Sequence, residues 1–85
     1  MAETFHLKVV GPEKLFVDEQ VSEAQIPALD GYLGVLAGHA ALMSELKAEG
    51  VLTYVVGGKT NSLTIKGGFV EVQSGRTRVL ADAVE

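Results

Sequence analysis

The segment Thr4-Phe5-His6-Leu7-Lys8-Val9 alternates apolar and polar side chains over the length of one strand. In an extended chain successive side chains point to opposite faces, whereas an α-helix repeats every 3.6 residues. Its three apolar residues therefore share one face, and the histidine and the lysine share the other. This period of two predicts a half-buried β-strand with its polar side toward solvent.

Further short extended segments, separated by turn residues, continue along the chain. Gly and Pro mark the connections, because Gly permits positive φ and Pro fixes φ and lacks a donor. Turns or loops are predicted at 11–14, 30–31, 37–39, 49–50, 57–61, 67–68 and 74–75. Strands are predicted at 15–17 (closed by the polar residues 18–20), 21–26 (ended by Pro27), 32–36, 51–56, 62–66, 70–73 and 77–80.

Two segments are ambiguous. Residues 41–47 could form a helix, because Ala, Leu, Met and Glu favour one, but a short segment between turn signals is more typical of a strand. The tail 81–85 could begin a helix.

With eight to ten short strands and ten glycines for tight connections, the sequence predicts an all-β fold, a small β-sandwich or flattened barrel. Residues 1–85 are long enough for a single domain.

Composition narrows the function. The net charge is −4, and the seven Lys and Arg residues form no cluster, which disfavours a nucleic-acid surface. The N-terminus lacks the basic and apolar segments of a signal peptide. The longest mostly apolar stretch, residues 32–43, is too short to cross a bilayer, so any membrane connection should be indirect. Without cysteine, stability must come from a dense apolar core, closed sheet edges or a docked partner.

Gly57-Gly58-Lys59-Thr60 ends like a phosphate-binding P-loop. The full pattern needs another glycine where Thr53 stands, and a helix should follow it, whereas a strand is predicted here. A plain hairpin loop is the preferred interpretation. Lys59 at a hairpin tip also raises the alternative of a lipoyl-type or biotinyl-type carrier domain, whose lysine is modified on an exposed turn. Its neighbours Gly58 and Thr60 differ from the usual acidic or methionine flanks.

Catalytic groups are sparse. His39 could serve as a general base, but no Ser or Asp lies beside it to act as nucleophile or orienting acid. A histidine that binds loop backbone or contributes to an interface is preferred. The glutamates are scattered singly, which is more typical of solvated faces than of paired-carboxylate catalysis. A small β enzyme is therefore the third hypothesis, and no catalytic, cofactor-binding or metal-binding residue is predicted.

The segment 30–42 contains three glycines and an apolar run, and it suits a shaped loop that presents backbone and apolar surface to a partner. Tyr32 directly follows the turn at Asp30-Gly31. We expect it to be a partly exposed aromatic, a type enriched in interfaces, while Leu33 could belong to the core.

Short motifs also occur in a fixed order along nearly the whole chain. They are Pro12-Glu13, Leu15-Phe16, Ile26-Pro27, Asp30-Gly31-x-x-Gly34-x-x-x-Gly38-His39-Ala40, Leu46-Lys47 followed by Gly50, Gly67-Gly68-Phe69-Val70-Glu71-Val72, and Val79-Leu80-Ala81-Asp82. This ordered set closely resembles the epsilon subunit of the rotary ATP synthase.

The chain departs from that family at several points. Ala37 and Ala41 stand where the family commonly has proline, which leaves the loop less preset. Tyr32 stands where the family often has an acid, so a charge-assisted contact is lost. Full members add two C-terminal helices, linked to inhibition of ATP hydrolysis and in some members to ATP binding, whereas this sequence ends at Glu85.

The resemblance implies a non-catalytic β-sandwich at the foot of the central stalk, without a cofactor, a metal or a small-molecule substrate. Such a rotor subunit would link the gamma subunit to the membrane c-ring and carry torque in proton-driven ATP synthesis. It would lie at the cytoplasmic face of a bacterial plasma membrane. By motif position, Asp30, Gly31, Tyr32 and Leu33 would face the c-ring, and Gly11, His39, Leu42 and Ser44 would face gamma.

Overall fold

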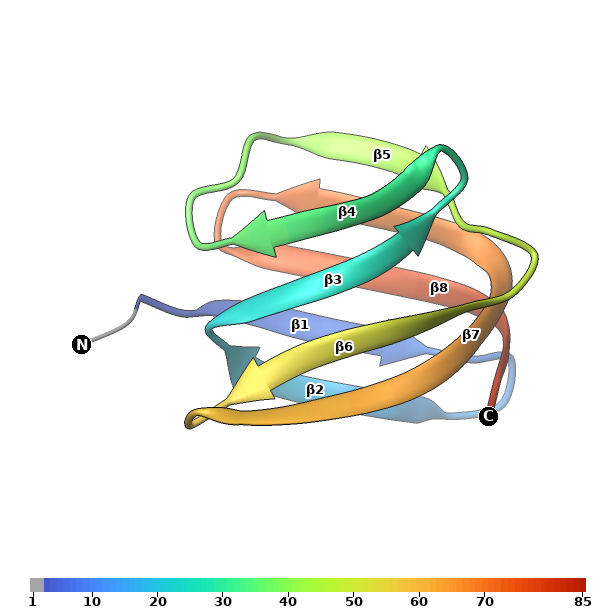
Figure 1. Cartoon of the computed structure of the whole chain (residues 1–85), viewed down its shortest axis with the longest axis horizontal. Helices are drawn as coiled ribbons and strands as arrows, with labels where there is room; N and C mark the ends of the chain where they lie inside the picture. The colour runs from blue at the N-terminus through green and yellow to red at the C-terminus, as the bar shows by residue number, and fades with distance from the viewer. Residues whose placement is uncertain (1–2) are drawn as a thin grey trace.

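Eight β-strands and short turns make up residues 3–85, the part of the chain that the computed structural model describes, and no helix occurs there (Figure 1). This confirms the predicted all-β fold. The strands are β1 (Phe5–Val10), β2 (Leu15–Val21), β3 (Glu23–Ala28), β4 (Gly31–Leu36), β5 (Leu42–Glu45), β6 (Gly50–Val56), β7 (Lys59–Gln73) and β8 (Arg76–Val84).

The strands follow the hydrogen-bonded order β2-β1-β8-β7-β6-β3-β4, and β5 pairs separately with β7. Only the β1–β8 pair is parallel; the other pairs of described strands are antiparallel. Figure 1 shows the two layers of a flattened sandwich, with β4, β3 and β6 in front and β5, β8, β1 and β2 behind. The long strand β7 curves around one side and belongs to both layers.

Two predictions are corrected along the long strand β7. Its first part pairs with β6, from Lys59 opposite Val56 to Ile65 opposite Gly50, so the predicted loop at 57–61 is only the turn Gly57-Gly58. Its last part pairs with β5. The predicted break at 67–68 is also wrong, because the strand bends there while its ladder with β8 keeps one register on both sides.

Pro27 does not end its strand, as the sequence had predicted. It lies inside β3, opposite Tyr32 of β4. The N–H and C=O of a strand residue point the same way, and the Pro27 carbonyl accepts a hydrogen bond from Lys47 N at 2.9 Å, away from β4. The missing N–H of proline therefore costs the β3–β4 ladder nothing.

Two strands are longer than predicted. β2 continues through the polar residues 18–20, because these pair with β1 while their side chains remain in solvent at the sheet edge. The tail 81–84 is the end of β8, paired with 65–68 of β7, so the expected helix start is wrong. The strand preferred for 41–47 is confirmed as β5.

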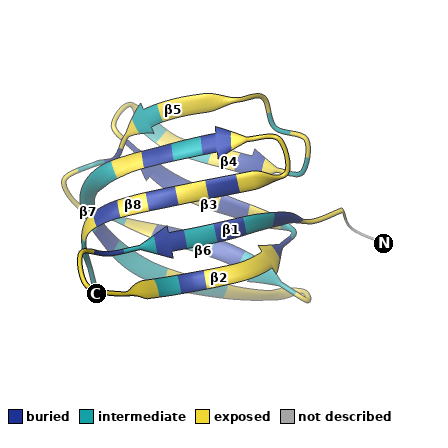
Figure 2. Ribbon diagram, turned by 180° about the vertical axis from the view of Figure 1, so that it is seen from behind, coloured by how far each residue is buried: buried dark blue, intermediate teal, exposed yellow. Residues whose placement is uncertain are grey.

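The core lies between the layers, where inward residues of both sheets interdigitate. Figure 2 shows the buried residues as stripes that alternate with more exposed ones, most clearly along β1 and β8. The predicted apolar face of β1 is confirmed, since Phe5, Leu7 and Val9 are all buried. Their neighbours in the core include Ile26, Leu52, Ile65, Val70 and Val79.

Thr77 is the exception in this core. It is 1% exposed, it lies between Leu7 of β1 and Val72 of β7, and its hydroxyl has no hydrogen-bond partner among residues 3–85. Burying an unpaired hydroxyl is unfavourable, whereas a methyl group of similar volume is not.

We expect Thr77→Val to stabilise the protein by about 1 kcal/mol, because it replaces the unpaired hydroxyl without changing the packing. Urea unfolding monitored by circular dichroism measures this change. Thr77→Ala is the control and should destabilise, since it leaves a cavity. If the valine variant were as unstable as the alanine variant, the hydroxyl would have to be satisfied in the folded state.

Candidate partner-binding surface

Three large apolar side chains are exposed on the outer side of the back layer. Met43 on β5 is 66% exposed, Phe69 on β7 is 52% exposed and Leu80 on β8 is 48% exposed. Together they line a shallow hollow of about 250 Å³. We call these three residues the outer apolar patch.

Strand register explains why these residues meet. Phe69 of β7 is directly opposite Leu80 of β8, and Leu80 is directly opposite Val10 of β1. Residues opposite one another on neighbouring strands project from the same face. The row continues to Leu15 of β2, which is also exposed, so apolar surface extends from the patch across the layer.

The two charged residues that line the same hollow as the patch pair with each other. Glu71 and Arg78 line the same hollow, and Arg78 donates a hydrogen bond of 2.8 Å to the Glu71 carboxylate. Between β1 and β2, the His6 ring contacts the Asp18 carboxylate. Because Glu71 and Arg78 neutralise each other, the hollow itself favours an apolar contact. The exposed Glu45, opposite Phe69 on β5, borders it on one side.

The β3–β4 hairpin brings together the four residues predicted to face the c-ring. Asp30 and Tyr32 are exposed, while Gly31 and Leu33 are half-buried. The Tyr32 hydroxyl accepts a hydrogen bond from Val51 N at 3.1 Å, and Lys47 Nζ lies 5.0 Å from the centre of its ring. The side chain is 52% exposed, as expected for a partly exposed aromatic.

The four residues predicted to face gamma do not form one cluster. Leu42 and Ser44 on β5 line a hollow of about 440 Å³ together with the β3–β4 hairpin. His39 lies in the β4–β5 connection, which is at the other end of β4 from the β3–β4 turn (Figure 1). Gly11 is buried in the β1–β2 turn, where its N–H donates to the Lys14 carbonyl at 2.9 Å.

His39 has the backbone contacts that the sequence suggested. Its Nδ1 donates to the Ala40 carbonyl at 2.6 Å, and its own amide donates to the Leu36 carbonyl at 3.1 Å. The ring lines a narrow crevice with Phe5 and Gly75. The histidine therefore fixes the shape of the connection.

Gly38, next to His39, has a φ of +83°, a conformation that side chains rarely adopt. Space is not the constraint, because a Cβ built there has no neighbour within 4 Å. We expect Gly38→Val to lower the free energy of unfolding by about 2 kcal/mol through backbone strain. Thermal unfolding measures this, and Gly38→Asn should cost less because Asn tolerates this conformation. Equal stability of wild type and the valine variant would contradict the strain.

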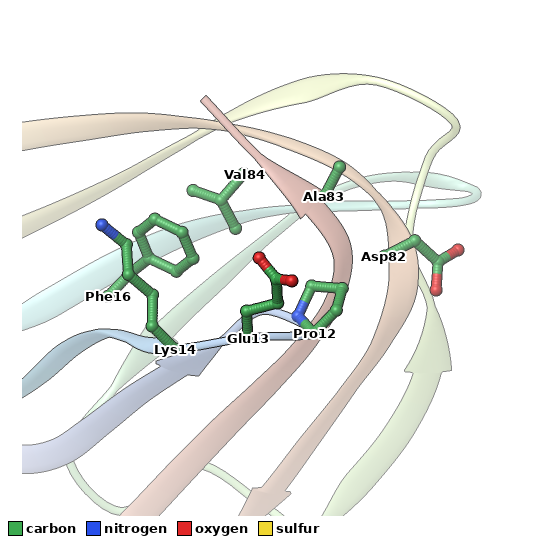
Figure 3. A pocket seen from close by; sticks show the side chains of 7 residues that line it. All are labelled: Pro12, Glu13, Lys14, Phe16, Asp82, Ala83 and Val84. Atoms are coloured by element: carbon green, nitrogen blue, oxygen red, sulfur yellow. The ribbon is translucent and has the colours of Figure 1, made fainter.

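Another hollow, of about 490 Å³, lies beside the β1–β2 turn and the end of β8. In Figure 3 the Lys14 side chain extends along the Phe16 ring, with Nζ 4.7 Å from the ring centre. The carboxylates of Glu13 and Asp82 come from opposite sides of the hollow and do not converge. The hollow therefore offers no paired-acid arrangement.

The P-loop resemblance also has a simple structural explanation. Strand β7 follows Gly57-Gly58 directly, so no helix N-terminus is available there to bind phosphate. Lys59 is the first residue of β7, opposite Val56, and not the tip of the turn as the carrier-domain alternative assumed.

Within residues 3–85 no group of three or more His, Cys, Asp or Glu residues could hold a metal ion. The described residues also include no helix long and apolar enough to span a membrane.

Two groups outside this surface, Tyr54 and Lys66, have raised pKa values. Burial raises the pKa of the Tyr54 hydroxyl on β6, and Glu19 adds to the shift. The hydrogen bond from Lys66 Nζ to the Glu85 carboxylate, 2.7 Å long, raises the pKa of Lys66. Neither group lies in the patch or in the β3–β4 hairpin.

Sequence reasoning missed the outer apolar patch. Each of its residues adjoins a second apolar residue in the same strand, as in Leu42-Met43, Phe69-Val70 and Val79-Leu80. Such doublets interrupt the period of two and place an apolar side chain on the solvent face. That interruption was the available signal.

Comparison with known proteins gives consistent matches. Residues 4–85 match the family model described as ATP synthase, Delta/Epsilon chain, beta-sandwich domain. The ATP synthase epsilon chain of Solibacter usitatus is 51% identical over 85 residues, covering 100% of this chain and 63% of the relative. That of Koribacter versatilis is 42% identical, covering 100% and 59%. The chain thus spans about three fifths of the length of these curated relatives.

Solved structures agree. A chain in the cryo-EM structure of the Euglena gracilis mitochondrial ATP synthase (OSCP/F1/c-ring) has a TM-score of 0.89 at 26% identity, with 100% of this chain and 54% of that chain covered. A chain in the central stalk/c-ring structure of the Tetrahymena thermophila mitochondrial ATP synthase has a TM-score of 0.80 at 14% identity, with 99% and 67% covered. The second likeness concerns the fold alone.

Proposed function

The chain belongs to the ATP synthase delta/epsilon β-sandwich family, and on that premise we propose that it is a non-catalytic subunit of the central stalk. In this role it binds the gamma subunit on one side and the membrane c-ring on another. It contributes to assembly and transmits torque during proton-driven ATP synthesis. It is held peripherally at the cytoplasmic face of a bacterial plasma membrane through these partners.

The outer apolar patch is the observation that carries this proposal. Met43, Phe69 and Leu80 expose apolar surface around a hollow whose two lining charges, Glu71 and Arg78, pair with each other. A small domain gains stability and specificity when such a face is covered by a partner. We assign the patch to the gamma subunit. Leu42 and Ser44 alternate with Met43 along β5 and line the hollow beside the β3–β4 hairpin, so we propose them as gamma contacts at the edge of this surface.

His39 and Gly11 have a different part in this proposal. Because His39 binds loop backbone and Gly11 is buried, we assign both to shaping the gamma-binding face and not to its central contacts.

The β3–β4 hairpin is the proposed contact with the c-ring. Asp30, Gly31, Tyr32 and Leu33 lie together there, and the turn projects from one end of the sandwich (Figure 1). The exposed ring and hydroxyl of Tyr32 can contact both apolar and polar groups of a loop. Tyr32 thus replaces the acid that the resemblance led us to expect.

The fold connects the two proposed surfaces rigidly. The Glu45 carbonyl on β5 accepts a hydrogen bond from Leu29 N in the β3–β4 turn at 2.9 Å, and Lys47 N donates to the Pro27 carbonyl on β3 at 2.9 Å. Strand β7 joins both layers covalently. A load applied at the patch can therefore reach the hairpin through packed and hydrogen-bonded elements. We propose residues 1–85 as one such unit, with residues 1–2 outside the described part.

Replacing Tyr32 with alanine tests the c-ring contact. We expect weaker binding of the isolated c-ring, measured by surface plasmon resonance in detergent, because the exposed ring is lost. The free energy of unfolding should fall by only about 1 kcal/mol, since the side chain is half exposed. Tyr32→Phe is the control that removes only the hydroxyl bonded to Val51 N. Unchanged c-ring binding by the alanine variant would remove the hairpin from the proposed interface.

A further inference from the structure

We propose that Met43 is an oxidation site, and that its conversion to methionine sulfoxide weakens docking of the gamma subunit on the outer apolar patch. The effect on docking rests on the proposed function. The oxidation itself depends only on the exposure and chemistry of the Met43 side chain.

Met43 carries the one sulfur atom in the described residues 3–85, and it is well exposed. The sequence contains no cysteine, and its two methionines are Met1 and Met43, so no thiol competes for the oxidant. At 66% exposure Met43 is also the most exposed of the large apolar side chains in the described part of the chain. Susceptibility to oxidation follows such exposure.

The position of Met43 gives solvent access from several sides. Its strand β5 is at an edge and pairs with β7 alone. The side chain lines the hollow of the patch with Phe69 and Leu80, the hollow beside the β3–β4 hairpin, and a third of about 340 Å³ with Ala41 and Val72. Met43 therefore stands on a ridge between these hollows and not at the bottom of one.

Oxidation of the Met43 thioether requires a two-electron oxidant such as hydrogen peroxide. A lone pair of the thioether sulfur attacks one peroxide oxygen, the O–O bond breaks, and the departing hydroxide takes up the remaining proton as water. The sulfur is oxidised by two electrons and the peroxide is reduced. The product is a chiral sulfoxide whose oxygen is a strong hydrogen-bond acceptor.

That acceptor would be poorly placed beneath a partner. The other apolar members of the patch, Phe69 and Leu80, offer no side-chain donor. The nearest cation lining the hollow is Arg78, which is already bound to Glu71 at 2.8 Å. Docking would have to remove water from the sulfoxide without replacing its hydrogen bonds, and that desolvation opposes binding. Folding should be little affected, because the side chain stays in solvent.

The test treats the complete chain with dilute hydrogen peroxide and follows two readouts. Peptide mass spectrometry locates the added oxygen, and calorimetric titration measures affinity for the gamma subunit of the same organism. We expect quantitative oxidation of Met43 and about tenfold weaker binding. Treatment with methionine sulfoxide reductases of both stereospecificities should restore the affinity.

Met43→Leu is the matched control, because leucine has a similar volume and cannot be oxidised, and the variant keeps Met1. It should bind gamma like the untreated wild type before and after peroxide. Resistance of Met43 to peroxide, or equal affinity of the oxidised and reduced wild type, would overturn the inference. Failure of the untreated chain to bind gamma would instead overturn the proposed function, while the mass spectrum would still decide the modification.

Discussion

Gly68→Ala is expected to lower the free energy of unfolding more than any other substitution considered for this chain. The φ of Gly68 is +116°, and an added Cβ would overlap the carbonyl oxygen of Leu80 and lie 2.9 Å from its carbonyl carbon. These are backbone atoms of the neighbouring strand β8, so no side chain can move to relieve the collision. The bend of β7 that joins the two layers would have to open.

The expected loss is at least about 4 kcal/mol, which is in the range of severe core mutations. A domain of this length is stabilised by roughly 4–13 kcal/mol in total. Far-ultraviolet circular dichroism and urea unfolding of the purified variant measure the loss.

Gly75→Ala is the matched control for this experiment. Gly75 also has a positive φ, +73°, but a Cβ there would have no neighbour within 4 Å. The control should therefore lose only about 1 kcal/mol, from backbone strain alone. Similar stabilities of the two variants would show that the approach of β8 to Gly68 is not a constraint on the fold.

Phe69→Ala is expected to weaken binding of the gamma subunit by about a hundredfold, as removal of a central aromatic anchor does in other interfaces. Phe69 is half exposed in the free chain and lies opposite Leu80, at the β7 end of the apolar row. The free energy of unfolding should change far less than the free energy of binding. Titration calorimetry and urea unfolding of the same preparation separate the two.

Val51→Ala is the control on the opposite layer. Val51 on β6 is likewise an exposed apolar strand residue, but it lies outside the patch. It should leave gamma binding unchanged. Equal losses in the two variants, or full affinity of Phe69→Ala, would count against the patch as the docking surface.

Sequence reasoning predicted the elements whose signals are local. The alternation in β1 and the turns at Gly57-Gly58 and Ser74-Gly75 were recognisable, because period and turn chemistry act over a few residues. The hairpin with Asp30 and Tyr32 was identified for the same reason.

What the sequence could not show depends on pairing between distant strands. In the sequence, Gly67-Gly68 resembles a connection between two strands. Only the ladder with β8 shows that it is a bend within one strand. Pro27 resembles a strand end until its carbonyl is seen to face Lys47. The outer apolar patch likewise exists only because β5, β7 and β8 bring Met43, Phe69 and Leu80 together.

The most direct test of the central claim is calorimetric titration of this chain into the gamma subunit of the same organism's ATP synthase. The proposal predicts saturable one-to-one binding that Phe69→Ala weakens and Val51→Ala does not. Absence of saturable binding, by a chain whose circular dichroism shows folded β-sheet, would contradict the proposed role in the central stalk.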